Sequence, residues 1–128
     1  MEFWLQDELA AHAAPQLERL ETLIGTALDA PSRYVFALSE FALQAAITEH
    51  AWWRAAHAAQ RFDAPLTARV ARGMADEALR EAPDMPALQA GLRRVRNRCQ
   101  LWIVWRHLAA RAPLEETTAA LSGLADIL

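Results

Sequence analysis

Histidine, cysteine, carboxylate and glycine residues are the groups that could support chemistry in this chain of 128 residues, and their spacing argues against most sites. A di-iron centre in a helical bundle needs Glu-x-x-His pairs, because a carboxylate and an imidazole then converge from one helix face. No glutamate here has a histidine three positions later. His50 and His57 share a helix face but are two turns apart, which is too far for joint ligation of one metal. We therefore interpret the histidines as ordinary surface or core residues.

Nucleotide binding is not supported by the motifs either. The four glycines are isolated from one another, so they build neither a Walker loop nor a dinucleotide fingerprint, and no Asp-x-Asp pair is present to hold magnesium. Cys99 is the single cysteine, and its apolar neighbours predict a raised thiol pKa and a place in the core. The sequence therefore predicts no catalytic, cofactor-binding or metal site within these residues.

Composition narrows the class of protein further. The net charge is -3, with 13 basic residues, all of them arginine, and 16 acidic ones, which disfavours a general polyanion binder. Charge is nevertheless uneven, because residues 85–114 hold six arginines and no acid. The acidic first residues do not resemble a secretory signal, and the longest run of large apolar residues, 101–105, is too short to span a membrane. We expect a cytoplasmic protein that has one unpaired cysteine and binds neither membrane nor nucleic acid.

The elements that must position these side chains are helices. Glycines are few, no segment alternates β-branched residues, and apolar residues mostly recur at three- and four-residue spacing. The sequence predicts an all-α bundle of about five to seven helices with short connections, in one helical domain over residues 1–128. Prolines and capping residues place the helices at about 2–13, 15–27, 34–38, 40–50, 63–80 and 85–110, with a last one after Pro113. Residues 51–61 are expected to continue or kink the helix at 40–50.

Several helix starts carry a recognisable signal. Ser39 is a predicted N-cap, Asp63 is predicted to cap the next helix with Pro65 in its first turn, and Asp84 with Pro86 repeats that pattern for the longest helix. The segment 29–32 is interpreted as a break. The last helix is expected to present one apolar side made of Leu114, Leu121, Leu124 and Ile127, with Glu115 and Glu116 at its N-terminal end.

The longest helix, from about Met85 to Ala110, changes character along its length. At about 100° per residue its first half has one apolar stripe. After Leu101, the residues Val104, Trp105 and Leu108 lie on the opposite side, so the second half must be covered on both sides. Arg106 falls back inside the original stripe, where an unpaired guanidinium is costly to bury. We expect Arg106 to have an acidic partner or to mark an interface.

The other arginines of this helix are Arg93, Arg94, Arg96 and Arg98, which spread over the rest of its circumference. We interpret them as a solvated face with ordinary salt bridges to neighbouring acids, each of which contributes little. For Trp102 and Trp105 the simplest interpretation is core packing.

Three ordered pieces of the chain resemble a known enzyme family. The first reads Ser39-Glu40-Phe41 and then His50-Ala51-Trp52, the second reads Leu92-Arg93-Arg94-Val95-Arg96-Asn97-Arg98 and then Trp102-Ile103-Val104-Trp105-Arg106, and the third runs through Leu114-Glu115-Glu116-Thr117 to Leu121-Ser122-Gly123-Leu124-Ala125-Asp126. Together they resemble the helical region that precedes the first nucleotidyltransferase domain of the bifunctional glutamine synthetase adenylyltransferase/adenylyl-removing enzymes. The family pattern has phenylalanine, arginine and proline where this chain has Val95, Trp102 and Ala51.

The resemblance implies that these residues are part of a longer multidomain enzyme of nitrogen metabolism. The family's N-terminal half removes AMP from a tyrosine of glutamine synthetase by phosphorolysis, its C-terminal half adds AMP from ATP, and the PII protein regulates both. Magnesium and ATP or phosphate are implied for the full-length enzyme, and no catalytic residue is carried over onto this chain. Trp102, Trp105, Leu108 and the last helix are then expected to pack against a nucleotidyltransferase domain.

A second interpretation stays open on the sequence alone. The chain would then be a free-standing helical adaptor whose arginine-rich face binds an acidic protein or a nucleic acid. Binding to nucleic acid should in that case weaken steeply as the salt concentration rises.

Overall fold

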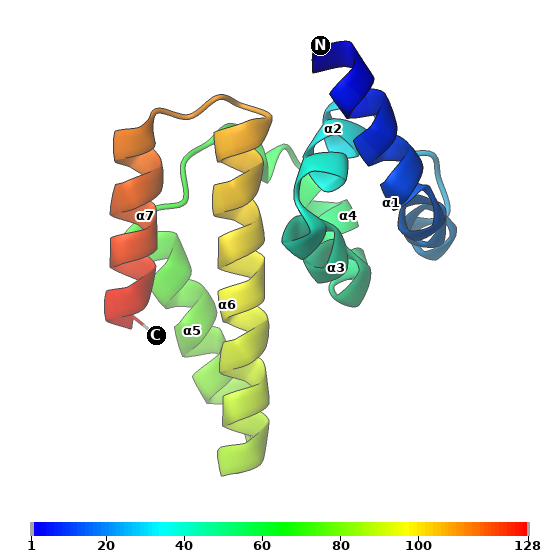
Figure 1. Cartoon of the computed structure of the whole chain (residues 1–128). Coiled ribbons are helices and arrows are strands. Elements are labelled where there is room, and N and C mark those ends of the chain that lie inside the picture. Colours follow the sequence, from blue (N-terminus) through cyan, green and yellow to red (C-terminus); the bar gives the residue numbers. More distant parts are fainter. Residues whose placement is uncertain (1, 128) are drawn as a thin grey trace. The chain divides into compact units, whose positions relative to one another are not determined.

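The computed structural model describes the backbone of residues 2–127 and the side chains of residue 8 and residues 11–127. This part of the chain forms seven α-helices and one short 3-10 helix, with no strand, which confirms the predicted all-α class (Figure 1). The helices group into two compact units, which divide between Arg61 and Phe62.

The first unit contains α1 (Glu2–Ile24), α2 (Ala30–Leu38), α3 (Glu40–Thr48) and α4 (His50–Ala58). Its core is made of apolar residues from all four helices, including Leu17, Leu20, Val35, Leu43 and Trp53. The rings of Phe36 and Trp53 meet edge to face, with centroids 5.3 Å apart. This packing ties α2 to α4.

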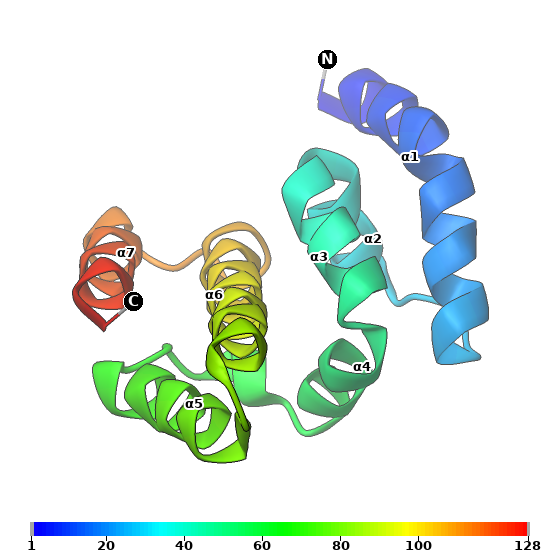
Figure 2. The ribbon, with the colours of Figure 1, turned by 90° about the horizontal axis from the view of Figure 1, so that it is seen from below.

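The prediction of two helices at about 2–13 and 15–27 is wrong, because the single helix α1 continues through Pro15. Proline lacks the N–H that would bond to the carbonyl of Ala11, and its ring crowds that carbonyl, so a helix that continues through proline bends. The ribbon of α1 changes direction partway along its length (Figure 2). Beyond the proline, Leu17, Leu20 and Ile24 are buried, and this burial opposes the cost of the bend.

The short helices of the first unit are separated by single residues. The prediction that Ser39 is an N-cap is confirmed, since its Oγ accepts a hydrogen bond from the amide of Ala42 at 3.0 Å. Glu49 alone separates α3 from α4, at φ -110° and ψ 38°. The break predicted at 29–32 lies earlier, between Ile24 and Ala30, because Asp29 caps α2 through the amide of Ser32 and Pro31 occupies the first turn of that helix. Proline suits the first turn of a helix because its missing N–H has no partner there in any case.

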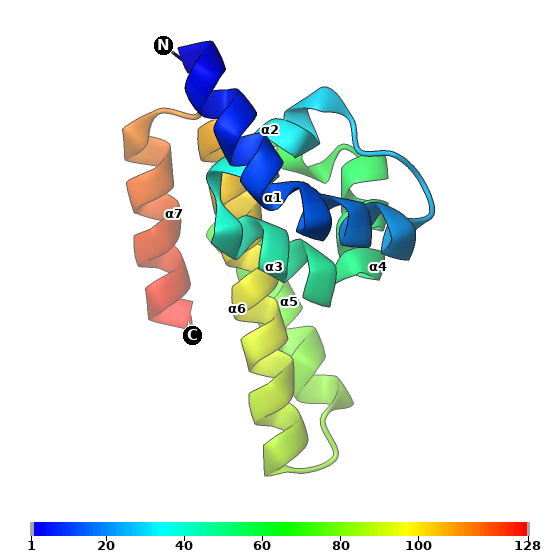
Figure 3. The same cartoon turned by 45° about the vertical axis from the view of Figure 1, so that its right-hand side comes forward.

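The second unit contains α5 (Ala68–Glu81), α6 (Met85–Leu108) and α7 (Leu114–Ile127), preceded by the 3-10 turn η1 (Arg61–Asp63). The helix α7 lies alongside the C-terminal half of α6, and α5 crosses α6 nearer its N-terminal end (Figures 1 and 3). The crossing with α5 is close at Gly91, where an added Cβ would lie 3.3 Å from the Cβ of Ala78.

The predicted N-cap is correct for α6 and wrong for α5. Asp84 caps α6 by accepting a hydrogen bond from the amide of Ala87 at 2.9 Å, as predicted. Thr67, not Asp63, caps α5, through the amide of Val70 at 3.2 Å. Asp63 lies in η1 instead, where its carbonyl is bonded to a side chain of α6. A long-range hydrogen bond therefore outweighs the local capping signal.

The helix α6 ends at Leu108, two residues before the predicted end. Arg111 has a positive φ of 52°, and the amide of Ala112 donates to the carbonyl of Arg106 at 2.9 Å. Arg111 lies three residues after Leu108, and a left-handed residue close to a helix end is usually glycine, so arginine there gives the sequence no visible stop signal. After this turn, α7 begins beyond Pro113, as predicted.

Candidate functional site

Arg106 is the residue that joins the parts of the second unit. Its guanidinium forms two parallel hydrogen bonds with Glu116 of α7, Nε to Oε2 and Nη2 to Oε1, both at 2.8 Å. Its Nη1 also donates to the carbonyls of Phe62 at 3.3 Å and Asp63 at 3.0 Å. The side chain of Arg106 thus connects α6, α7 and the segment before α5. The pair with Glu116 confirms the prediction that Arg106, lying in the apolar stripe of α6, has an acidic partner.

The same hydrogen bonds shift both ionisable groups. The side-chain hydrogen bonds with Glu116 raise the pKa of Arg106, against a smaller opposing effect of burial. The hydrogen bonds from Arg106 lower the pKa of Glu116, again more than burial raises it. Each partner stabilises the charged form of the other, so the pair is ionised across the neutral pH range. Paired charge-assisted bonds of this kind also fix geometry, because the planar guanidinium matches the carboxylate in one orientation.

Phe62 is the aromatic centre of this arrangement. Its ring meets Trp102 edge to face, with centroids 5.7 Å apart, and lies tilted against Trp105 at 5.6 Å. The indole Nε1 of Trp102 donates to the carbonyl of Ala64 at 3.0 Å. The segment 62–64 is therefore held to α6 by three rings and by hydrogen bonds to three of its carbonyls. The sequence offered no signal for Phe62, because its partners lie about forty residues further along the chain.

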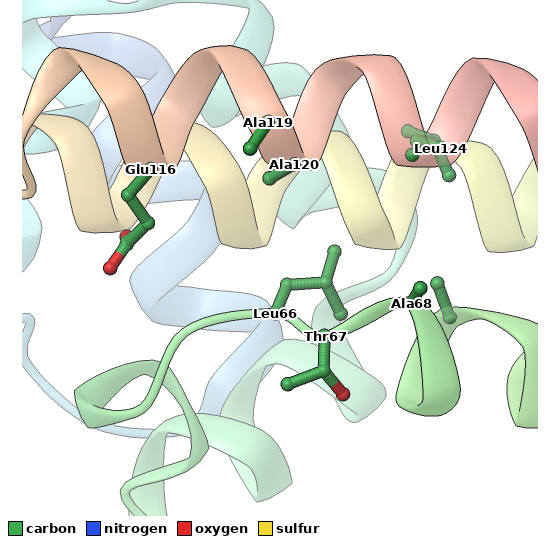
Figure 4. A pocket seen from close by; sticks show the side chains of 9 residues that line it. Leu66, Thr67, Ala68, Glu116, Ala119, Ala120 and Leu124 are labelled. Carbon is green, nitrogen blue, oxygen red and sulfur yellow. The ribbon is translucent and has the colours of Figure 1, made fainter.

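A groove lies beside this cluster, between α7 and the start of α5. It encloses about 220 Å³, and its walls are mostly small or aliphatic side chains. Glu116, Ala119, Ala120 and Leu124 line it from α7, and Leu66, Thr67 and Ala68 face them from the other side (Figure 4). Gly123 also lines the groove, and a Cβ added there would meet no atom within 4 Å. The chemistry of the groove is apolar, with one carboxylate at its edge that is already bonded to Arg106.

The outer side of α7 is an exposed apolar surface. Leu114 and Leu121 are 68% and 46% exposed, and we call these two residues the α7 outer stripe. They lie about 160° and 140° around the helix from Glu116, so the bond to Arg106 turns them away from α6. The predicted apolar side of α7 is therefore only partly covered, because Leu124 is buried whereas Leu114 and Leu121 are exposed.

Trp102 and Trp105 have a different environment from the one that the family resemblance suggested. Both are only 5% exposed, and both rings contact Phe62 of the same chain. Of the residues expected to pack against a further domain, Leu108 is half-buried and keeps some accessible surface. Docking of a further domain on this end of α6 stays a prediction, with Leu108 and the α7 outer stripe as the surface available to it.

The remaining arginines of α6 do not all share one environment. Arg93, Arg94 and Arg96 are exposed, and no carboxylate of the described residues lies within 4.0 Å of their guanidinium groups. The salt bridges that the sequence suggested for them are therefore not formed within the described chain. Arg98 is partly buried and does have an interaction of its own.

Cys99, His50 and His57 each have a contact within the fold. Burial raises the pKa of the Cys99 thiol to about 11, and its Sγ lies 3.9 Å from the Sδ of Met74. His57 bonds through Nε2 to Oδ2 of Asp29 at 2.7 Å and stacks on Trp53, while Nδ1 of His50 contacts the carbonyl of Ile47. Among the side chains that the structure describes, no three His, Cys, Asp or Glu residues gather as they would around a metal ion. These side chains therefore do not fit the magnesium that the family resemblance implies for the full-length enzyme.

Within residues 2–127, no helix combines the length and the apolar character that a transmembrane segment needs.

Fold and site together define an all-α protein whose second unit is joined by Arg106 and carries exposed leucines on α7. The chain belongs to the glutamate-ammonia ligase adenylyltransferase family, whose profile matches residues 31–128. Among curated proteins, it is 34% identical over 122 residues to the bifunctional glutamine synthetase adenylyltransferase/adenylyl-removing enzyme of Pseudomonas aeruginosa, covering 95% of this chain. The enzyme of the same name from Pseudomonas putida is 33% identical over 123 residues, covering 96%. The chain spans about 12% of the length of each of these relatives. No solved structure matches it.

Proposed function

We propose that this chain is a helical region of a glutamine synthetase adenylyltransferase/adenylyl-removing enzyme, and that it supports the domain that removes AMP from glutamine synthetase. The observation that carries the proposal is the family match, which includes the whole of the Arg106 cluster and both helices joined by it. The proposed role is mechanical: the region holds a neighbouring nucleotidyltransferase domain in position, while the catalytic groups, magnesium and the nucleotide or phosphate belong to that domain.

The surface proposed to hold that domain is the α7 outer stripe together with Leu108. Two leucines that are 68% and 46% exposed on one helix face leave apolar area in water that a packed neighbour would remove. The bidentate bond between Arg106 and Glu116 sets the rotation of α7, so it decides which residues form this surface. Regulation by PII and location in the cytoplasm are part of the same proposal, on the strength of the family alone.

The proposal is tested in the complete enzyme by changing the outer stripe. In the variant Leu114→Glu/Leu121→Glu, two charges replace the proposed apolar contact, and phosphorolysis of adenylylated glutamine synthetase is expected to fall by about tenfold or more. The assay measures ADP, which forms when inorganic phosphate attacks the adenylyl phosphorus and the tyrosine oxygen leaves.

The matched control is Leu79→Glu/Met85→Glu. Leu79, near the end of α5, and Met85, the first residue of α6, are 59% and 63% exposed, so they test the effect of two added charges at a similar exposure. The control is expected to retain wild-type phosphorolysis. Equal activity of the outer-stripe variant and the wild-type enzyme would contradict the proposed docking surface.

A further inference from the structure

A basic surface on the first half of α6 has no role in the proposal above. Arg93 and Arg96 are exposed and lie one helical turn apart, and Gln89 precedes Arg93 by four residues as Gln100 follows Arg96 by four. These four side chains lie within about 60° of one another around the helix. We call them the arginine face.

The arginine face points away from the neighbouring helix α5. Gly91 marks the side of α6 that meets α5, because its position lies against Ala78. Arg93 and Arg96 lie about 160° and 140° around the helix from Gly91. Both are exposed, so the packing of α5 and α7 on α6 leaves the face accessible.

The charges of the arginine face are not balanced by its own helix. The helix α6 contains no acidic residue at all, and no described carboxylate lies within 4.0 Å of Arg93 or Arg96. The neighbouring helix α5 differs in its charge pattern, because it contains acidic residues. Its Arg72 and Arg80 each lie one helical turn from Asp76. Like charges one turn apart on a helix repel each other, by about 0.2–0.5 kcal/mol per pair. An opposite charge from outside the helix would remove that repulsion.

We propose that the arginine face binds an acidic segment of a protein that presents two carboxylates about one helical turn apart. The two arginines are separated by three residues, which is a rise of about 4.5 Å and matches carboxylates three or four positions apart on a partner helix. Each guanidinium can bind one carboxylate through two parallel hydrogen bonds. The flanking glutamines add neutral amide groups, which bond to polar groups of the partner and repel neither sign of charge.

An acidic protein segment suits this face better than a nucleic acid does. Affinity for nucleic acid grows with the number of phosphates neutralised, and this face offers only two cations. A longer polyanion would also extend past the face toward Asp84, the N-cap of α6, and Glu81 at the end of α5, in a chain of net charge -3. A short acidic segment avoids both problems. The proposal does not depend on the phosphorolytic role, so either can fail without the other.

The test uses the 128-residue chain and a fluorescein-labelled, alanine-based helical peptide that carries glutamates three positions apart. Fluorescence anisotropy measures binding at low and at raised salt for the wild-type chain, for R93E/R96E and for R69E/R72E. The last variant changes the net charge by the same amount at exposed arginines of α5. We expect the peptide to bind the wild-type chain about tenfold or more tightly than R93E/R96E, with most of the affinity kept in R69E/R72E.

Three results would overturn the proposal. They are no binding by the wild-type chain at low salt, an equal loss in both charge-reversal variants, and tighter binding of a single-stranded oligonucleotide of the same charge through Arg93 and Arg96. Thermal melts of each variant establish that it is folded. If R93E/R96E melts below the assay temperature, R93Q/R96Q replaces it and is expected to weaken peptide binding in the same direction.

Discussion

Arg106 joins α6 to α7 through two parallel hydrogen bonds with Glu116. Its place in the apolar stripe of a helix indicated that it needs an acidic partner, because an unpaired guanidinium is costly to bury. The identity of that partner depended on the turn after α6 and on the rotation of α7, neither of which leaves a local signal. Glu116 is ten residues away in the chain and bonds to Arg106 at 2.8 Å. The pattern of α6 alone predicts that Arg106 has an acidic partner. Identifying that partner as Glu116 requires the placement of both α6 and α7.

The ion pair predicts how the stability of the chain depends on acid. Since the pKa of Glu116 is lowered in the folded chain below its ordinary value of 4.5, the folded state holds its proton less tightly than the unfolded state does. The stabilisation is therefore complete above about pH 4.5 and is lost as the pH falls through the lower folded value. The melting temperature of the wild-type chain should fall more steeply below that pH than that of Glu116→Gln, as measured by circular dichroism.

The control for this experiment is Glu115→Gln. Glu115 is the exposed neighbour of Glu116 in the first turn of α7 and has no ion pair with a described residue. Its variant should follow the wild-type curve. Parallel curves for wild type and Glu116→Gln would show that the bond to Arg106 contributes nothing to folding.

Cys99 allows a second test at the residue scale. Its side chain is fully buried and burial raises its pKa to about 11, so almost no thiolate is present near neutral pH. We expect the folded chain to react with a thiol reagent such as 5,5′-dithiobis(2-nitrobenzoic acid) at least about a hundredfold more slowly than the chain in denaturant. Absorbance of the released thiolate measures both rates. Comparable rates would place Cys99 at the surface.

At the scale of the element, the helix starts were predictable where the cap is local. Ser39 and Asp84 cap their helices through amides three residues further on, and both were identified from sequence. The start of α5 was placed too early, because Arg106 takes up the carbonyl of Asp63. The bend of α1 at Pro15 was read as two helices, since nothing local shows that Leu17, Leu20 and Ile24 are buried beyond it.

Two helical glycines give a prediction about packing between elements. A Cβ at Gly123 would meet no atom within 4 Å, so Gly123→Ala should raise the free energy of unfolding by about 0.5–1 kcal/mol through its higher helix propensity. A Cβ at Gly91 would lie 3.3 Å from the Cβ of Ala78, so in Gly91→Ala the crossing of α5 and α6 must widen. The free energy of unfolding of Gly91→Ala should therefore rise less than that of Gly123→Ala, or fall below that of the wild-type chain. Urea denaturation of both variants measures the difference, and equal gains would mean that the crossing is not tight.

At the scale of the whole molecule, the class of protein was more predictable than its internal contacts. The all-α fold followed from periodicity and from the scarcity of glycine, and the family followed from three short pieces in order. The sequence did not predict that the helices group into two compact units. It also did not predict that Phe62 covers Trp102 and Trp105. Both depend on contacts between residues far apart in sequence, which no pattern within one helix encodes.

We propose that this chain supports a domain that removes AMP from glutamine synthetase and does not catalyse that reaction itself. ADP release from adenylylated glutamine synthetase in the presence of phosphate tests this proposal. The measurement compares the 128-residue chain alone, the nucleotidyltransferase domain produced without this region, and the two combined. We expect no ADP from the chain alone and a higher rate from the combination than from the domain by itself. Turnover by the chain alone, or a rate unchanged by its addition, would overturn the proposed supporting role.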